Sequence, residues 1–266
     1  MKNSVDNSKF IQALRPITEM GKSNMRKAKL QTIYLMVFLI SLGAKLTSCT
    51  KAGSGAVVTG PAYSFISTMN LAPYGDSANI YFGGNEYPGG AIPIGSYSNS
   101  YFKVASGTYD VDFKTPTTDS LLAEIPSSTF DSLGFYTILT YNDSANGAVK
   151  AAKITENFSN ITNDSAYFRF FNMSPDVASV DLYINGTKVQ SSRAPADNIL
   201  NTFLNNFQGI PGGYYTIVAK LAGTNTMVGT TLTVSFQSGQ VFTIFLEELH
   251  GAAGNSFSLA ILQFTD

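Results

Sequence analysis

Hydrophobic and polar positions alternate along most of the chain after Tyr63, with the two-residue period of β-strands. In residues 180–184, "VDLYI", the first, third and fifth side chains would point to one face of a strand, and residues 78–82, "ANIYF", follow the same pattern. A turn signal follows each segment, Asn-Gly at 185–186 and Gly-Gly at 83–84. No stretch after Tyr63 keeps a helical period of apolar residues, so the pattern predicts an all-β fold.

The alternating pattern occurs twice along the chain. Residues 69–84 read "MNLAPYGDSANIYFGG" and residues 171–186 read "FNMSPDVASVDLYING". Four residue types recur at one constant spacing, in the pairs Asn70 and Asn172, Pro73 and Pro175, Tyr81 and Tyr183, and Gly84 and Gly186. Downstream, residues 106–113 correspond to residues 212–219 at a slightly longer spacing, which we attribute to a short insertion in a loop. We infer two tandem copies of one β unit.

The two predicted units are residues 63–158 and 159–266. Each is of immunoglobulin-like size, about 100 residues with some seven short strands. The predicted fold class is therefore all-β, with two tandem immunoglobulin-like β-sandwich domains, each folding on its own core. The sequence holds no Trp and one Cys, so the buried Trp and the paired cysteines of antibody domains are missing.

The N-terminal part has the pattern of an export signal. Residues 25–49, "MRKAKLQTIYLMVFLISLGAKLTSC", have a basic start, an apolar run at 33–42 and small residues near the end. The apolar run is shorter than the roughly 20 residues that a membrane-spanning helix needs. We therefore expect residues 1–48 to be a signal peptide, with the true start at Met25.

The only cysteine of the chain stands directly after this signal. Residues 46–49, "LTSC", resemble the lipobox of bacterial lipoproteins, in which the thiol is acylated and the chain is cut just before it. Cys49 is the predicted lipidation site, and residues 49–62 are a predicted flexible tether. Lys45 departs from the pattern, and the alternative is a chance cysteine near an ordinary signal or a membrane anchor.

Removal of residues 1–48 changes the net charge. They hold eight of the 17 basic residues and two of the 18 acidic ones, which leaves nine basic and 16 acidic residues and a formal net charge of −7. The remaining chain has no basic stripe for phosphate contacts, so we expect no nucleic-acid partner.

The sequence offers little catalytic chemistry. His250 is the only histidine, and it stands in "ELHGAAGN", which we interpret as a polar turn between the last two strands. No G-x-S-x-G motif accompanies it. Zinc is usually bound by Cys and His, and the chain has one of each. We expect no enzyme activity, no cofactor and no metal.

One pair of carboxylates is a candidate for a catalytic or calcium-binding site. Asp110 and Asp112 are two positions apart, hence on one strand face, as a solvated face or a carboxylate or calcium site would require. The aligned residues of the second unit are Thr216 and Val218, so the pair is not a feature of the repeat. We favour the solvated face.

The second copy carries a family resemblance. The residues concerned are Phe168, Arg169, Phe170, Asn172, Ser174, Pro175, Asp176, Val180, Asp181, Tyr183 and Gly186. This pattern resembles domain of unknown function family 4397. The first copy follows the pattern more loosely and has Asn79 at the position equivalent to Asp181. The resemblance implies a β-sandwich module of exported bacterial proteins, often in tandem and often behind a lipobox, with no established activity. We interpret Asn172, Pro175, Asp176, Asp181, Tyr183 and Gly186 as structural signature residues, Asp176 closing the turn after Pro175.

Asp-Ser followed by an aliphatic residue occurs five times, with the serines Ser77, Ser120, Ser132, Ser144 and Ser165. The triplet is similar to the O-glycosylation acceptor motif of exported Bacteroidetes proteins. The alternative is that Asp-Ser suits turns.

The expected function is that of a non-catalytic, lipid-anchored cell-envelope protein that acts as a scaffold, a spacer or a binding module. An alternative is a glycan-binding accessory protein of polysaccharide capture or adhesion, with sugar rings stacked on Tyr74, Tyr87, Tyr97, Tyr101 and Tyr214. Hydrolase activity is the third and least favoured hypothesis of function.

The expected partners are the membrane, through a lipid on Cys49, and an unknown envelope protein or glycan. We expect an outer-membrane lipoprotein. Residues 50–52, "TKA", lack the acidic residues that often follow the cysteine in surface-exported lipoproteins, which favours the periplasmic face.

Overall fold

Strands make up nearly all of the regular structure in the computed structural model, which describes residues 62–251 and 254–264. The predicted all-β sandwich fold is therefore confirmed. In the described part of the chain, no helix has the length and apolar character needed to cross a membrane.

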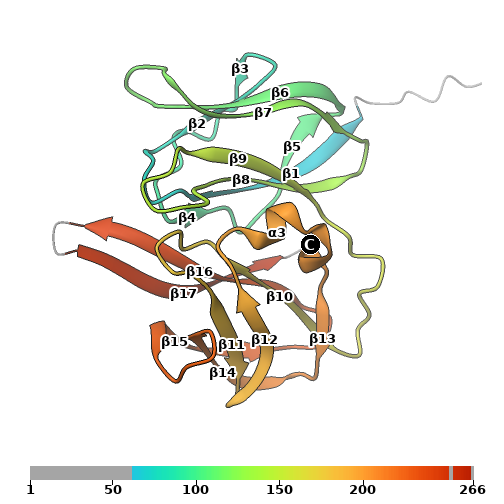
Figure 1. Cartoon of the computed structure of the whole chain (residues 1–266). Helices are drawn as coiled ribbons and strands as arrows, with labels where there is room; N and C mark the ends of the chain where they lie inside the picture. Colours follow the sequence, from blue (N-terminus) through green and yellow to red (C-terminus); the bar gives the residue numbers. More distant parts are fainter. Residues whose placement is uncertain (1–61, 252–253, 265–266) are drawn as a thin grey trace, which may run out of the picture. The chain divides into compact units, whose positions relative to one another are not determined.

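The first sandwich consists of two sheets (Figure 1). The first mixed sheet has the order β4-β1-β8-β9, with β5 also paired to β1, and β1 runs parallel to β8. Its strands are β1 (Tyr63–Leu71), β4 (Ser96–Tyr97), β5 (Phe102–Ala105), β8 (Phe135–Tyr141) and β9 (Lys150–Thr155). The first antiparallel sheet has the order β3-β2-β6-β7. Its strands are β2 (Asn79–Phe82), β3 (Asn85–Glu86), β6 (Gly107–Lys114) and β7 (Leu121–Phe130).

The second sandwich has the same plan. The second mixed sheet has the order β13-β10-β16-β17, and β10 runs parallel to β16. Its strands are β10 (Ala166–Asn172), β13 (Gln208–Ile210), β16 (Val241–Gly251) and β17 (Gly254–Phe264). The second antiparallel sheet has the order β12-β11-β14-β15. Its strands are β11 (Val180–Ile184), β12 (Thr187–Arg193), β14 (Gly213–Leu221) and β15 (Met227–Phe236).

The longer spacing of the downstream repeat has a local cause. Between β12 and β13 the second sandwich carries two short helical turns, α3 (Asp197–Leu200) and η2 (Thr202–Asn205). The first sandwich has β4 in the corresponding place, and its β5 corresponds to β13, since each pairs antiparallel with the start of β1 or β10.

The two turns predicted at residues 83–84 and 185–186 have the expected backbone conformation, with positive φ at both residues. Asn185 and Gly186 have φ values of 48° and 79°, and Gly83 and Gly84 have φ values of 54° and 78°. Two successive residues with positive φ form the tight turn whose twist matches a β-hairpin. The repeated sequence therefore places the same hairpin in both sandwiches.

Each sandwich has a core between its two sheets. Ile80, Val111 and Ile138 belong to the first core. Val180, Leu182 and Ile184, the apolar face predicted for β11, are buried in the second core with Phe170. The alternation of the strands thus predicted the inner faces correctly.

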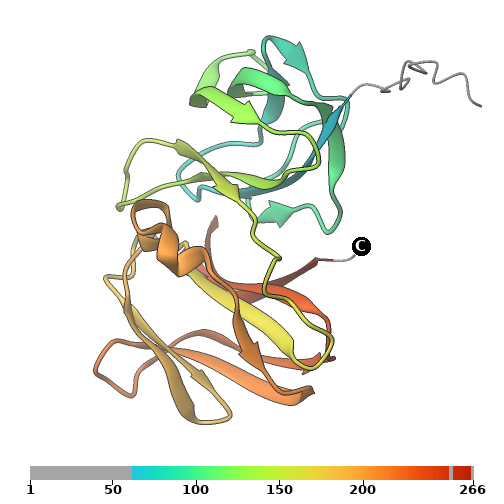
Figure 2. The same ribbon diagram turned by 90° about the vertical axis from the view of Figure 1, so that its right-hand side faces the viewer.

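A third apolar cluster, here called the shared core, joins the two sandwiches. It contains Met69, Leu71 and Leu139 from the first mixed sheet and Phe171, Phe245 and Leu262 from the second, with Met173 directly after β10. These residues lie on the opposite faces of their strands from the first and second cores, so the outer faces of the two mixed sheets pack together (Figure 2). The two sandwiches consequently form one compact unit, Gly60–Asp266, instead of two with separate cores only.

Candidate functional site

The predicted modification sites differ in what can be said of them. Cys49 lies outside the described residues. All five serines of the Asp-Ser triplets lie in turns or loops. Ser120, Ser132 and Ser144 are exposed, whereas Ser77 and Ser165 are partly buried.

Asp110 and Asp112 lie on β6, and each contacts a neighbouring group. Asp110 accepts a 2.6 Å hydrogen bond from the backbone N–H of Ser127. Asp112 lies 3.9 Å from the ammonium of Lys114. These contacts give the pair structural roles at a strand bulge and in a surface ion pair.

Three of the signature residues hold the second sandwich together. Asn172 is fully buried, donates to the carbonyl of Arg193 and accepts from the N–H of Ser174. The ring of Tyr183 lies 4.6 Å from the Lys220 ammonium. Gly186 forms the β11–β12 turn with its positive φ.

Asp181 is buried, although its place in the alternation predicted the outer face of β11. Its carboxylate accepts hydrogen bonds from the N–H groups of Ser192 and Gly223 and from the Lys188 ammonium. These donors, the Ser192 N–H foremost, lower the pKa of the Asp181 carboxyl. The carboxylate is therefore stable inside the fold as an anion.

We expect Asp181→Asn to lower the free energy of unfolding by about 1.5–3 kcal/mol at pH 7, the range for hydrogen bonds to a charged group. Because the folded-state pKa is lowered, the Asp181 contribution is fully present above the unfolded-state pKa and disappears as the pH falls through the folded-state pKa. Urea unfolding between pH 7 and pH 2 should show the wild-type and variant curves converging in acid. Exposed Asp164 supplies the control: Asp164→Asn should change the free energy of unfolding at pH 7 by no more than about 0.5 kcal/mol.

His250 belongs to β16, not to a turn as the sequence suggested. It is paired with Asn255 across the β16–β17 hairpin. Its side chain is 24% exposed, and its ring meets the Tyr74 ring edge-on at 4.2 Å between centroids.

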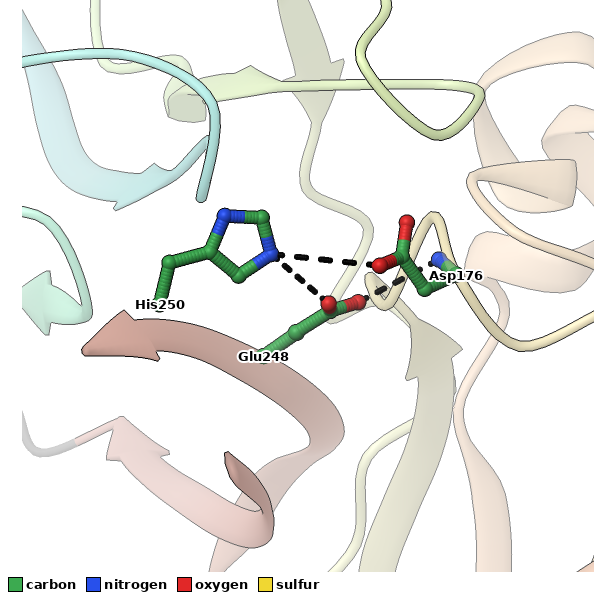
Figure 3. Close-up of side chains that lie close together, drawn as sticks. All are labelled: Asp176, Glu248 and His250. Carbon is green, nitrogen blue, oxygen red and sulfur yellow. Dashed lines mark hydrogen bonds and ion pairs between the residues drawn. The ribbon is translucent and has the colours of Figure 1, made fainter. Parts of the chain in front are cut away.

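His250 lies in a cluster with two acidic side chains, shown in Figure 3 and here called the carboxylate–histidine cluster: Asp176, Glu248 and His250. The Nε2 atom of His250 is 2.8 Å from Oε1 of Glu248 and 4.0 Å from Oδ2 of Asp176. Glu248 and His250 share one face of β16, while Asp176 comes from the β10–β11 connection. Among the described residues, these are the ones brought together as a set of three potential metal ligands.

Glu248 is the buried member of the cluster, with a side chain 0% exposed. Its Oε2 atom accepts hydrogen bonds from Ser174 Oγ at 2.8 Å and from the Asp176 N–H at 3.2 Å. Its Oε1 atom accepts from Asn255 Nδ2 at 2.9 Å and lies within hydrogen-bond distance of His250. The carboxylate thus fixes the Ser174–Asp176 turn to the end of β16.

The sequence suggested that the Asp176 side chain closes the turn after Pro175, but the structure gives it other partners. Its carboxylate accepts hydrogen bonds from Tyr74 Oη, at 2.7 and 2.9 Å, and from Asn255 Nδ2 at 2.8 Å. The hydrogen bond to Asp176 raises the pKa of the Tyr74 phenol. Tyr74 belongs to the first sandwich, so the cluster lies where the two sandwiches meet.

Residues 64–183 match the family model DUF4397, a domain of unknown function. The DUF4397 match covers β1 to β10 and most of β11, hence all strands of the first sandwich and the start of the second. The resemblance seen in the sequence is strongest in the second copy, at residues 168–186, whereas the match covers mainly the first copy. No curated protein matches the chain.

A buried ion pair lies at the same junction. Arg169 on β10 forms two hydrogen bonds, of 2.7 and 2.8 Å, to the carboxylate of Glu156, which follows β9. Both side chains are essentially unexposed, at 1% and 0%. Thr137 of the first sandwich donates to Glu156, and Arg169 donates to Thr243 of the second. Charged groups from the inter-sandwich segment and the second mixed sheet are thus joined inside the protein.

A cavity of about 930 Å³ lies near this ion pair, since Phe264 in its wall has its ring centroid 5.6 Å from the Arg169 guanidinium. Its wall includes Phe65, Tyr101, Phe135, Phe158 and Phe264, together with Asn163, Gln240 and Gln263. Within residues 62–251 and 254–264, the buried hydroxyl of Tyr101 has no hydrogen-bond partner, and burial raises the pKa of this phenol.

The tyrosines proposed for sugar stacking do not form one surface. Tyr97 packs edge-on against Phe245, and Tyr87 stacks on Phe102. Tyr214 is 81% exposed, and Tyr74 is held by Asp176. Of the five, Tyr101 is the one that faces the large cavity.

Proposed function

We propose that the protein is a non-catalytic cell-envelope lipoprotein, anchored by a lipid on Cys49, whose two β-sandwiches act together as a scaffold or spacer. The shared core is the observation that carries this proposal. Two sandwiches joined by a polar, exposed linker would move independently. Here Glu156, the first residue after β9, is itself buried in an ion pair, which favours a stiff connection.

The second sandwich is, in this proposal, a second DUF4397 module. The corresponding strand orders of the four sheets support it, as do the recurring residues at the start of each unit. The proposed location is the outer membrane, with the periplasmic face favoured by the residues after Cys49. The proposal leaves catalysis out because the sequence has no nucleophile motif to accompany its single histidine.

A glycan-binding module is the second candidate, and the cavity near the ion pair supports it. Aromatic side chains provide flat apolar faces on which sugar rings stack, and Asn163, Gln240 and Gln263 provide hydrogen-bonding amides. A rigid connection between the sandwiches would keep this cavity in one shape.

We expect Cys49→Ser to abolish incorporation of an alkyne-labelled fatty acid and to release the protein from the membrane fraction. Protease treatment of intact cells, with lysed cells as the control, then distinguishes the two candidates. Protection until lysis is expected for a periplasmic scaffold. Cleavage on intact cells would contradict the periplasmic location and favour glycan capture, and unchanged labelling of Cys49→Ser would contradict the anchor.

A further inference from the structure

The carboxylate–histidine cluster has the spacing of a metal site. The ligand atoms of Asp176, Glu248 and His250 all lie within 4.8 Å of one another. Zinc bonds to nitrogen and oxygen are about 2.0–2.2 Å long, so two ligands of one ion are separated by roughly 3–4 Å. The separations of 2.8 and 4.0 Å from the His250 nitrogen to the two carboxylates bracket this range. We propose that Asp176, Glu248 and His250 bind a divalent transition-metal ion.

The charge of the cluster supports a cation. Two carboxylates lie close together, and that of Glu248 is completely buried. In the described part of the chain, neither carboxylate has a Lys or Arg nitrogen within 4.0 Å, and His250 is their ion-pair partner. A buried carboxylate without a counter-charge is costly. A divalent cation would neutralise both carboxylates at once.

The donor set selects the class of metal. An imidazole nitrogen suits zinc, copper, nickel or iron, whereas calcium takes six to eight oxygen ligands. One imidazole and two carboxylates therefore favour Zn²⁺, with Mn²⁺ as a weaker competitor. The partly exposed side chains of Asp176 and His250, at 21% and 24%, give the ion an entry path and leave room for water ligands.

The surrounding groups already hold the ligands in place. Ser174 Oγ and the Asp176 N–H occupy Oε2 of Glu248, which leaves Oε1 facing His250. The Tyr74 hydroxyl binds the Asp176 carboxylate, and its ring packs against the imidazole. Such outer contacts orient the ligands in established metal sites.

Asn255 contacts both carboxylates of the cluster. Its Nδ2 atom lies 2.8 Å from Asp176 Oδ2 and 2.9 Å from Glu248 Oε1, where it bridges the two carboxylates. The oxygen and nitrogen of an amide are exchanged by rotation of the side-chain end. In the structure the amide N–H₂ bridges the carboxylates, and in the proposed metal-bound form its oxygen would turn inward as a fourth ligand.

The test is calorimetric titration of the full-length chain with Zn²⁺, Mn²⁺ and Ca²⁺ in detergent after dialysis against a chelator. The titrated protein carries the substitution Cys49→Ser, because a free thiol binds zinc by itself. We expect one Zn²⁺ per chain, bound at least tenfold more tightly than Ca²⁺. Zinc should also raise the melting temperature.

Two variants decide the assignment. His250→Gln and Asp176→Asn should each weaken Zn²⁺ binding at least tenfold, as ligand loss requires, while Asp143→Asn, an exposed carboxylate elsewhere, should leave it unchanged. Asn255→Asp adds a carboxylate and should strengthen binding, so a folding defect in one variant does not decide the outcome. Stoichiometry near zero, equal affinity for Ca²⁺, or Zn²⁺ binding that persists in the His250→Gln/Asp176→Asn double variant would overturn the proposal.

Discussion

Replacing Arg169 by methionine is expected to lower the free energy of unfolding by about 3–5 kcal/mol, the cost of leaving a buried charge without its partner. Arg169 forms four hydrogen bonds, two of them to Glu156, and its guanidinium lies 4.4 Å from the Phe207 ring centroid and 4.8 Å from that of Phe171. Methionine preserves much of the volume, so the loss measures the charge and the hydrogen bonds. Urea unfolding of the purified full-length chain, followed by circular dichroism, measures the change.

Two comparisons separate the buried pair from ion pairs in general. Lys150 and Asp143 form an exposed ion pair, and Lys150→Met should cost no more than about 1 kcal/mol. The double variant Arg169→Met/Glu156→Met removes both charges and should recover most of the stability, since an apolar pair can replace a buried ion pair. A loss below 1 kcal/mol for Arg169→Met alone would contradict the buried pair.

Phe245→Ala is expected to cost about 3–5 kcal/mol, as truncation of a buried phenylalanine does. Phe245 is 0% exposed and packs edge-on against Tyr97 of the first sandwich. Its neighbour Ile244 points to the second core and remains in place. The truncation therefore weakens the contact between the sandwiches, and we expect the single urea transition to broaden or to divide into two.

The control for this change is Phe203→Ala. Phe203 is 74% exposed, so its truncation should change the stability by no more than about 0.5 kcal/mol. Phe242→Ala, in the second core, should cost as much as Phe245→Ala while leaving the first sandwich intact. An effect of Phe245→Ala that equals that of Phe203→Ala would contradict the shared core.

Much of the fold could be predicted because its signals are local. Alternation in residues 180–184 identified the inner face of β11, and Asn185-Gly186 identified its turn. The shared core was missed, although β10 carries a sign of it. From Phe168 to Met173 every residue is buried, and a strand covered on both faces has no alternation to display.

The carboxylate–histidine cluster could be predicted only in part. Glu248 and His250 are two positions apart on one strand, and a short hairpin places Asn255 opposite His250. These relations follow from the sequence once His250 is assigned to a strand. The approach of Asp176 and Tyr74 does not, because it depends on how the two mixed sheets pack.

The shared core has one consequence for how the repeat has diverged. Met69 and Phe171, Leu71 and Met173, and Tyr74 and Asp176 are equivalent positions of the two copies. The first two pairs all belong to the shared core, and Tyr74 donates a hydrogen bond to Asp176. This is the arrangement of an isologous dimer, in which a patch contacts its own copy. A true homodimer must place identical side chains across its axis. Within one chain the two halves are free to differ, so a phenol can face a carboxylate where a symmetric dimer would oppose two phenols or two like charges.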